Sequence, residues 1–179
     1  MFREMRRSKQ QLNDEATKKI LTGATGGVLA LDGDDGYTYA LPISFAYDDT
    51  NQKIYFHSAI KGHKIDAIKN NSKVSFCVID QDQIVGEKFT TYFKSAIVFG
   101  RIKIIDDNND PEKRRGLEIL SEKYSPTVSI EKRDKVIESQ IKALVVMVLE
   151  IDYMTGKQAK ELINAECGMR NYFNYELEL

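Results

Sequence analysis

The chain has 179 residues, of which 42% are hydrophobic and 30% charged, and its formal net charge is −1. This is the composition of an ordinary globular protein with one core, and the balanced charge gives no reason to expect nucleic acid as a partner. No apolar run approaches the ~20 residues that cross a bilayer, and the first residues lack the apolar segment of a signal peptide. We therefore expect a cytoplasmic protein that does not associate with membranes.

The two cysteines, Cys77 and Cys167, are too few for a disulfide framework and suit a reducing compartment. They form no CxxC pair, and the chain's two histidines are not spaced as ligands on one helix face. We expect no metal site.

The first half of the chain alternates strands with tight turns. After a basic arm over residues 1–12, Asn13 or Asp14 is expected to cap a short helix through DEATKKIL. Three β-prone runs follow, separated by the turn-forming clusters GDDG and DDTNQ, and they cover residues 27–32, 36–47 and 53–59. Connections this short make neighbouring strands antiparallel. A helix over 63–70 then leads into a strand over 73–79.

The second half contains one long β-prone run over 89–105, followed by a helix that Asp110 caps and Pro111 begins. A short helix over 134–141, a strand over 143–151 and a helix over 156–163 are expected next, and residues 165–179 form a C-terminal tail. We predict one domain over 1–179, mostly antiparallel β with helices, in which about six strands form a barrel.

One strand-to-helix turn, within IYFHSAIKGHKIDAIKNN, gathers His57, Ser58, His63 and Lys64. A helix start exposes backbone N–H groups with partial positive charge, Gly62 permits a tight bend, and Lys64 adds a full charge. Together they predict an anion site, with phosphate as the usual ligand. The alternative is that Ser58 is a simple cap and the other three side chains are exposed without a role.

Other catalytic and phosphate-binding motifs are absent. No G-x-G-x-x-G opens a helix after a strand, and Gly156-Lys157 lacks the upstream glycine of a P-loop. There is no G-x-S-x-G, and neither histidine has an obvious nucleophile beside it in the sequence.

Four segments together resemble a known family: MRR near the N-terminus, YALPISFAYDD, IYFHSAIKGHKIDAIKNNSKVSFCV and SAIVFGRI. Over nearly the whole chain the sequence is similar to the flavin-binding split-barrel proteins related to pyridoxamine 5'-phosphate oxidase, and especially to their nitroimidazole-resistance branch. The resemblance implies a six-stranded split barrel that forms a homodimer with FMN at the interface. The arginine-and-lysine arrangement of the true oxidases is missing from YALPISF, so that exact activity is not expected.

The resemblance also implies roles for individual residues. His57 is the candidate for substrate contact or proton donation, although strand alternation puts it on the face opposite Ser58. The implied cofactor contacts are Leu41, Pro42, Ile43 and Ser44 along the ring, Ser58, His63 and Lys64 at the phosphate, His57 near the flavin and substrate, Ala59 beside them, and Tyr92 and Ser95 at the pocket border. Relatives carry a cysteine and a tyrosine near the positions that Phe89 and Phe93 occupy here, so the substrate pocket differs.

The function implied is an FMN-dependent oxidoreductase that reduces a small nitroaromatic or quinone-like electron acceptor. Its electrons would come from NAD(P)H taken up transiently, because the sequence offers no dedicated fold for that donor. Two alternatives stay open: a flavin-binding sensor without turnover, and a split barrel that uses haem or a deazaflavin.

Overall fold

Eight strands form one antiparallel sheet in the computed structural model, which describes residues 1–163. Their order is β3-β2-β6-β7-β8-β5-β4, and β1 pairs with β8. No ladder joins the end strands β3 and β4 in the described part of the chain, so the barrel is split. The strands are β1 (Gln11–Leu12), β2 (Gly26–Asp32), β3 (Thr38–Ser44), β4 (Ala46–Asp48), β5 (Lys53–Ala59), β6 (Lys73–Val85), β7 (Thr90–Ile105) and β8 (Leu144–Gln158).

The predicted antiparallel β fold with helices is confirmed, but two local features raise the strand count above six. The run over 36–47 breaks at Phe45, so that β3 pairs with β2 whereas β4 pairs with β5. The backbone N–H of Phe45 donates instead to the Tyr124 hydroxyl at 3.0 Å. The last two residues of the basic arm form β1 against β8.

Helix starts follow the capping residues. Asn13 caps α1 (Asp14–Gly23) and Asp110 caps α3 (Pro111–Tyr124), both as predicted. The helix α2 (His63–Asn70) has the predicted bounds. The helix α4 (Ile130–Gln140) begins earlier than predicted, because the Ser129 side chain accepts from the Lys132 N–H and supplies a cap.

The predicted helix over 156–163 is wrong in its first half, because residues 156–158 finish β8 and helical residues begin at Lys160. The predicted tail over 165–179 lies outside the described residues. Four short 3-10 turns complete the described part, at Ser8–Gln10, Asp34–Gly36, Gly86–Lys88 and Ile141–Ala143.

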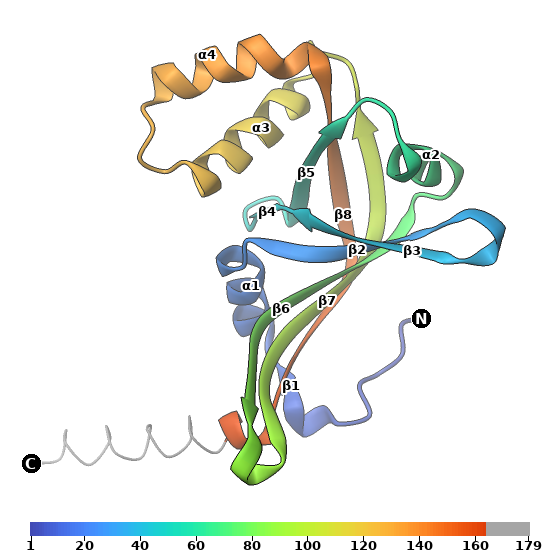
Figure 1. The fold of residues 1–179 in the computed structure, drawn as a ribbon, viewed down its shortest axis with the longest axis vertical. Coiled ribbons are helices and arrows are strands. Elements are labelled where there is room, and N and C mark those ends of the chain that lie inside the picture. The colour runs from blue at the N-terminus through green and yellow to red at the C-terminus, as the bar shows by residue number, and fades with distance from the viewer. Residues whose placement is uncertain (164–179) are drawn as a thin grey trace, which may run out of the picture.

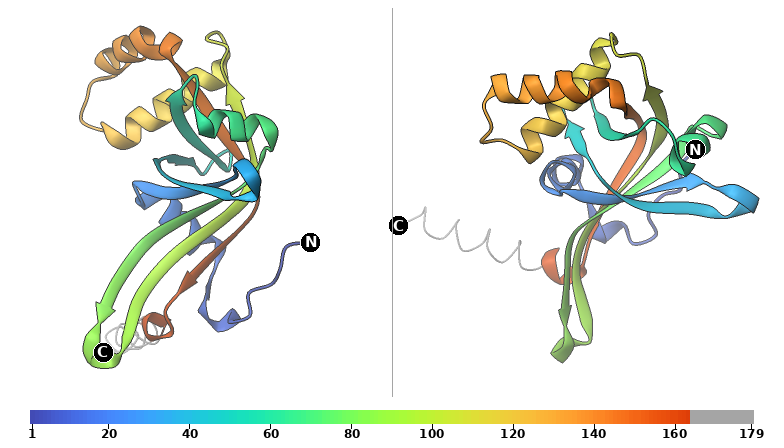
Figure 2. Two further views of the ribbon diagram at one scale, coloured as in Figure 1. Left: turned by 45° about the vertical axis from the view of Figure 1, so that its right-hand side comes forward. Right: turned by 45° about the horizontal axis from the view of Figure 1, so that its top comes forward.

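The molecule is elongated along its longest strands. Figure 1 shows α3 and α4 together at one end, beside β5 and β8, while the β6–β7 hairpin projects at the other end. The two further views agree with this arrangement (Figure 2). No helix among residues 1–163 is long and apolar enough to cross a membrane.

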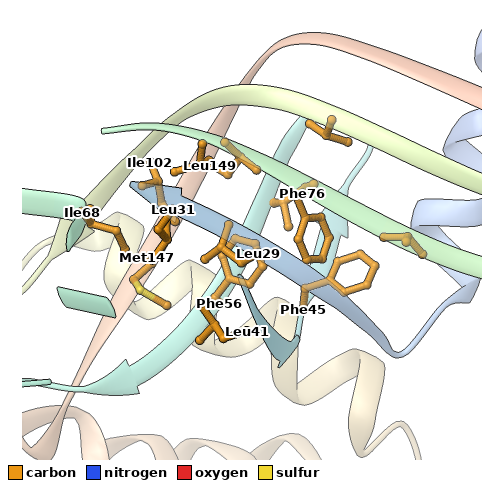
Figure 3. Close-up of a cluster of buried hydrophobic side chains, with 14 of the residues drawn as sticks. Leu29, Leu31, Leu41, Phe45, Phe56, Ile68, Phe76, Ile102, Met147 and Leu149 are labelled. Atoms are coloured by element: carbon orange, nitrogen blue, oxygen red, sulfur yellow. The ribbon is translucent and has the colours of Figure 1, made fainter. Parts of the chain in front are cut away.

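The main core lies inside the sheet, where α1 and α2 also contribute apolar side chains. Phe76 packs edge-on against Phe45 and Phe56, with ring centroids 4.8 and 5.2 Å apart, at the centre of the cluster in Figure 3. A second, smaller cluster lies under α3 and includes Tyr55, Leu117 and Val146. Residues 54 to 56 of β5 therefore contribute to both cores by strand alternation.

The strands β7 and β8 approach closely at Gly100. A Cβ atom there would lie 2.0 Å from the Glu150 carbonyl oxygen, which no packing adjustment of a side chain could relieve. The glycine in SAIVFGRI therefore has a structural reason, and it coincides with a register shift between Phe99 and Gly100.

The C-terminal end of α3 is attached to the rest of the molecule by two adjacent side chains. The Lys123 ammonium donates to the carbonyl oxygens of Leu21 and Ala24 at the end of α1, and it lies 4.2 Å from the centroid of the Phe45 ring. Burial lowers the pKa of Lys123 to about 8. The Tyr124 hydroxyl bonds to the backbone of Phe45.

We expect the free energy of unfolding to rise between pH 8 and about 10, because the unfolded chain still binds a proton at Lys123 whereas the folded protein does not. Above pH 10 the trend reverses, since burial raises the pKa of Tyr47 and Tyr55 to about 12 and only the unfolded chain loses those protons. Urea unfolding at pH 7.5 and 9.5 measures the rise, and Lys123→Met should abolish it. The exposed Lys135→Met variant should keep it; a rise that persists in Lys123→Met would contradict the assignment.

Candidate functional site

The start of α2 presents unpaired hydrogen-bond donors. Gly62 adopts φ +129°, a conformation that side chains rarely take, and nothing lies within 4 Å of where its Cβ would be. The N–H groups of Ile65 and Asp66 bond to the Gly62 carbonyl, whereas those of His63 and Lys64 have no acceptor within residues 1–163. The Lys64 ammonium makes no ion pair with that part of the chain. The turn is therefore an electropositive helix start with free donors.

This turn is joined to β3 through His63. The imidazole stacks on the Tyr39 ring, with centroids 4.0 Å apart and planes inclined by 14°. Its Nε2 atom lies 3.4 Å from Asp34 Oδ2, at the tip of the β2–β3 hairpin. Residues that are far apart in the sequence thus place the first turn of α2 beside the start of β3.

The strand β3 offers an unpaired edge. It is the terminal strand of the sheet and pairs only with β2, so one row of its backbone groups has no ladder partner within residues 1–163. The Leu41 and Ile43 side chains point into the core, which leaves Pro42 and Ser44 on the outer face. A cavity of about 440 Å³ lies beside them and is lined also by Gly26, Gly27, Val28, Cys77 and Ile79.

A second cavity, of about 290 Å³, lies between β5 and the pair α3–α4. His57 lines it together with Ser44, which also lines the first cavity. The remaining lining residues are neutral: Leu117, Leu120, Ser121, Tyr124, Ser125, Val136, Ile137, Gln140 and Leu144. His57 thus contributes the imidazole among the described lining residues of this cavity, and Ser44 lines both cavities.

Comparison with known proteins identifies the family. The sequence pattern of the family described as pyridoxamine 5'-phosphate oxidase matches residues 13–158. The chain belongs to this family. No protein with a curated description matches the sequence.

Solved structures in which the oxidase-like fold recurs include three that cover most of this chain. A candidate 5-nitroimidazole antibiotic resistance protein from Bacteroides thetaiotaomicron has a TM-score of 0.70 and 22% identity, covering 83% of this chain and 86% of its own. An FAD-binding protein from Mesorhizobium loti has a TM-score of 0.56 and 23% identity over 84% and 97% of the two chains. An FAD and haem binding protein from Mycobacterium smegmatis has a TM-score of 0.65 and 19% identity over 84% and 74%. At these identities the likeness is one of fold.

In this member of the oxidase family, the two neighbouring residues His57 and Ser58 point in opposite directions, as strand alternation predicts. The Ser58 side chain faces the core and only 6% of the residue is exposed. Its hydroxyl has no hydrogen-bond partner within residues 1–163. A buried hydroxyl without a hydrogen bond costs free energy, so this atom indicates a position at which a bound ligand could supply the missing hydrogen-bond partner.

The predicted site residues fall into two sets. Pro42, Ile43 and Ser44 line the first cavity, and Ser44 and His57 line the second, while His63 stacks on Tyr39 of the same strand β3. Leu41, Ser58, Ala59 and Lys64 are not among the described lining residues of either cavity. Ser95 pairs with Ile79, which lines the first cavity. Tyr92 lies farther out on the β6–β7 hairpin, where its hydroxyl accepts from Lys88 at 3.0 Å, and it lines neither cavity.

Sequence reasoning missed the contribution of α3 and α4. Tyr124 lines the His57 cavity and also holds the backbone of Phe45, the residue after Ser44. No motif signals such a role, because Phe45 and Tyr124 are 79 positions apart. Within residues 1–163, no group of three histidine, cysteine or acidic side chains could hold a metal ion.

Proposed function

We propose that this protein binds FMN and reduces a small neutral acceptor, such as a nitroaromatic or quinone-like compound. The observation that carries the proposal is the continuity between three features: the open α2 turn, the free edge of β3 and the cavity that contains His57. An elongated ligand with an anionic end fits the first two, and a reactant beside it fits the third. The family membership and the FAD-binding protein of the same fold support the choice of a flavin.

The residues at the α2 turn suit a phosphate group. The N–H groups of His63 and Lys64 and the Lys64 ammonium have no acceptor in the described part of the chain, and phosphate oxygens would satisfy all of them. The hydroxyl of Ser58 lies at the end of the preceding strand, and it too lacks a hydrogen-bond partner within residues 1–163. The absence of a side chain at Gly62 lets the ligand approach the backbone closely.

The flavin ring would lie along residues 41 to 44. The pyrimidine edge of the ring carries both donors and acceptors, and the unpaired backbone of an edge strand offers the complementary groups. Pro42 has no backbone N–H group, and this gap in the row of donors is tolerated on an edge strand. The proline ring also gives the flavin ring an apolar surface. Leu41 and Ile43 contribute through their backbone, because their side chains are used in the core.

The acceptor would bind in the cavity beside His57. Among residues 1–163, no lysine, arginine or carboxylate lines this cavity, so a phosphorylated or otherwise charged substrate would lose its hydration without gaining a partner there. When bound, the flavin supplies the electrons, which NAD(P)H would deliver to it beforehand. The role of His57 is to donate a proton from its imidazole to the acceptor as that molecule gains negative charge, and to recover the proton from solvent.

A homodimer would complete the site. One row of side chains crosses the outer face of five strands in register: Pro42, Val28, Cys77, Ile97 and Thr155. Val28 and Ile97 are 38% and 39% exposed, and Ile79 beside them is 62% exposed. A second copy of the chain is the occupant that the family resemblance implies for this apolar band, and it adjoins the first cavity. The partner's hairpin would then be available to bring Tyr92 to the ring.

We expect Ile97→Glu to convert the dimer to monomer and to weaken FMN binding, because a carboxylate would be buried without a partner at the interface. Sedimentation velocity measures the first effect and flavin fluorescence titration the second. Ile130→Glu is the matched control, since Ile130 is exposed on α4 away from the band. A variant at Ile97 that stays dimeric would contradict this assignment of the interface.

The test of the proposed function begins with the absorption spectrum and mass of any small molecule that co-purifies. Bound FMN gives two yellow absorption bands, whereas haem gives a sharp Soret band. Bleaching by NADPH followed by recovery on adding a nitroaromatic compound would support turnover. A protein that binds FMN but does not recover colour with any neutral acceptor would be a sensor or storage protein, which contradicts the enzymatic part of the proposal.

A further inference from the structure

A third cavity, of about 610 Å³, lies at the opposite end of the molecule from α3 and α4. It is formed by residues 6–10 of the arm, the start of β7 and residues 159–161 after β8. Figure 1 shows the arm and β1 beside the projecting β6–β7 hairpin. We propose that this cavity binds a purine nucleotide that carries an exocyclic amino group, with AMP as the probe. The proposal does not depend on FMN binding.

The cavity has an excess of positive charge, which favours an anionic ligand. Of the described lining residues, Arg6, Arg7, Lys9 and Lys160 are cationic and Glu161 alone is acidic; its carboxylate lies 3.9 Å from the Lys160 ammonium. The other three cations make no ion pair within residues 1–163, although the net charge of the whole chain is −1. Two adjacent guanidinium groups present planar forks of donors that match phosphate oxygens in pairs.

Two buried glutamine side chains at this end of the molecule have amide oxygens that lack a hydrogen-bond donor within residues 1–163. Gln10 lines the cavity and is 8% exposed, and its Oε1 has no partner within residues 1–163. Gln158 is not among the lining residues, but it is 5% exposed and its Oε1 also has no partner within residues 1–163. The register of β1 against β8, in which Gln11 lies opposite Lys157, brings the two glutamines next to each other. Rotation about the terminal torsion of glutamine costs little, so the Gln10 amide can turn toward a ligand.

The two requirements together define the ligand class. A phosphate satisfies the cations, and an amino group on an aromatic base supplies an N–H donor to the Gln10 amide oxygen, as adenine does with glutamine. The half-buried Phe93 adds an aromatic side chain to the wall, and Thr90 and Thr91 add hydroxyl groups. The volume lies within the range of about 300–1,000 Å³ that is usual for small-molecule sites.

The arm is held in place at both ends, so its arginines are preorganised. Phe2 stacks on Tyr153 at 4.8 Å and contacts Phe99 at 5.5 Å, while β1 pairs with β8 at the other end. Between these anchors the Gln10 N–H donates to the Arg7 carbonyl at 2.9 Å. Less conformational entropy is then lost when a ligand binds than in a free basic tail.

Isothermal titration of the full-length protein with AMP, adenosine, IMP and inorganic phosphate tests the proposal. AMP should bind more tightly than the other three, because adenosine lacks the phosphate, phosphate lacks the base, and IMP has a carbonyl where AMP has its amino group. Arg7→Ala should weaken AMP about tenfold to hundredfold by removing charge-assisted hydrogen bonds. Arg3→Ala, on the same arm but outside the cavity, should leave the affinity unchanged.

The Gln10→Met variant tests whether the Gln10 amide recognises the amino group of the base. This substitution removes an unsatisfied buried amide, so it should raise the melting temperature of the free protein while it abolishes the preference for AMP over IMP. A purely structural glutamine would instead lower the melting temperature and leave that preference intact. No binding of AMP, equal binding of AMP and inorganic phosphate, or an equal loss in Arg3→Ala and Arg7→Ala would each overturn the proposal.

Discussion

Replacing Lys64 with alanine is expected to weaken the binding of FMN about tenfold to hundredfold, because a charge-assisted hydrogen bond contributes about 1.5–3 kcal/mol. The Lys64 ammonium has no anionic partner within residues 1–163, so its loss disturbs no ion pair of the described structure. Riboflavin has the same ring but no phosphate, and its affinity should be almost unchanged. Fluorescence titration of both ligands, with the variant and the unmodified protein, measures the difference directly.

Lys69→Ala is the matched control for Lys64→Ala. Lys69 lies on the same helix, but in its last turn, where no free N–H groups are exposed. The control should therefore bind FMN normally. Equal losses for FMN and riboflavin in Lys64→Ala would show that the lysine does not contact the phosphate, and the site would then have to be placed elsewhere.

Local signals in the sequence were sufficient to predict the helices that position this turn. Gly62 marks the start of α2, and Ile65 and Ile68 repeat at helical spacing on its buried face. Asn13 and Asp110 cap helices because their side chains bond to backbone N–H groups only three and two residues ahead. Such features depend on neighbours in the sequence, and they can be read without knowing the fold.

The features that the sequence did not predict depend on distant contacts. Nothing near Phe45 indicates that the strand breaks there, because the group that replaces its ladder bond is the hydroxyl of Tyr124 on α3. The last residues of β8 look helical in isolation, but pairing with β7 and β1 keeps them extended. Tertiary hydrogen bonds outweighed local preference in both places.

The candidate site divides in the same way. His57, Ser58, His63 and Lys64 are close in the sequence, so their association with a strand-to-helix turn could be predicted. The cavity around His57 could not be predicted, because its lining combines Ser44 on β3 with residues of α3 and α4, the first of which is Leu117. Its lack of charged lining residues, which determines the expected substrate class, becomes evident only when these elements are packed together.

Replacing His57 with asparagine should lower kcat for a neutral nitroaromatic acceptor by about 10²- to 10⁴-fold, the usual contribution of a positioned general acid. Asparagine keeps a polar side chain in the cavity but cannot release a proton near neutral pH. His57 is exposed and lies on the opposite face of β5 from Ser58 and the main core, so the variant should fold and bind FMN normally. KM should change much less than kcat, because the lost interaction develops only as the acceptor gains charge.

Two further measurements separate proton donation by His57 from a role in packing. Ser121→Ala alters a hydroxyl of the same cavity and should leave kcat almost unchanged. In His57→Ala, added imidazole should restore part of the rate, because a small acid can occupy the space that the side chain leaves; it would not repair a packing defect. If His57→Asn retained full activity, or if imidazole had no effect while FMN binding was normal, the proton would have to come from solvent or from the phenol of Tyr124, which also lines the cavity. The cavity would then select the acceptor by size and neutrality alone.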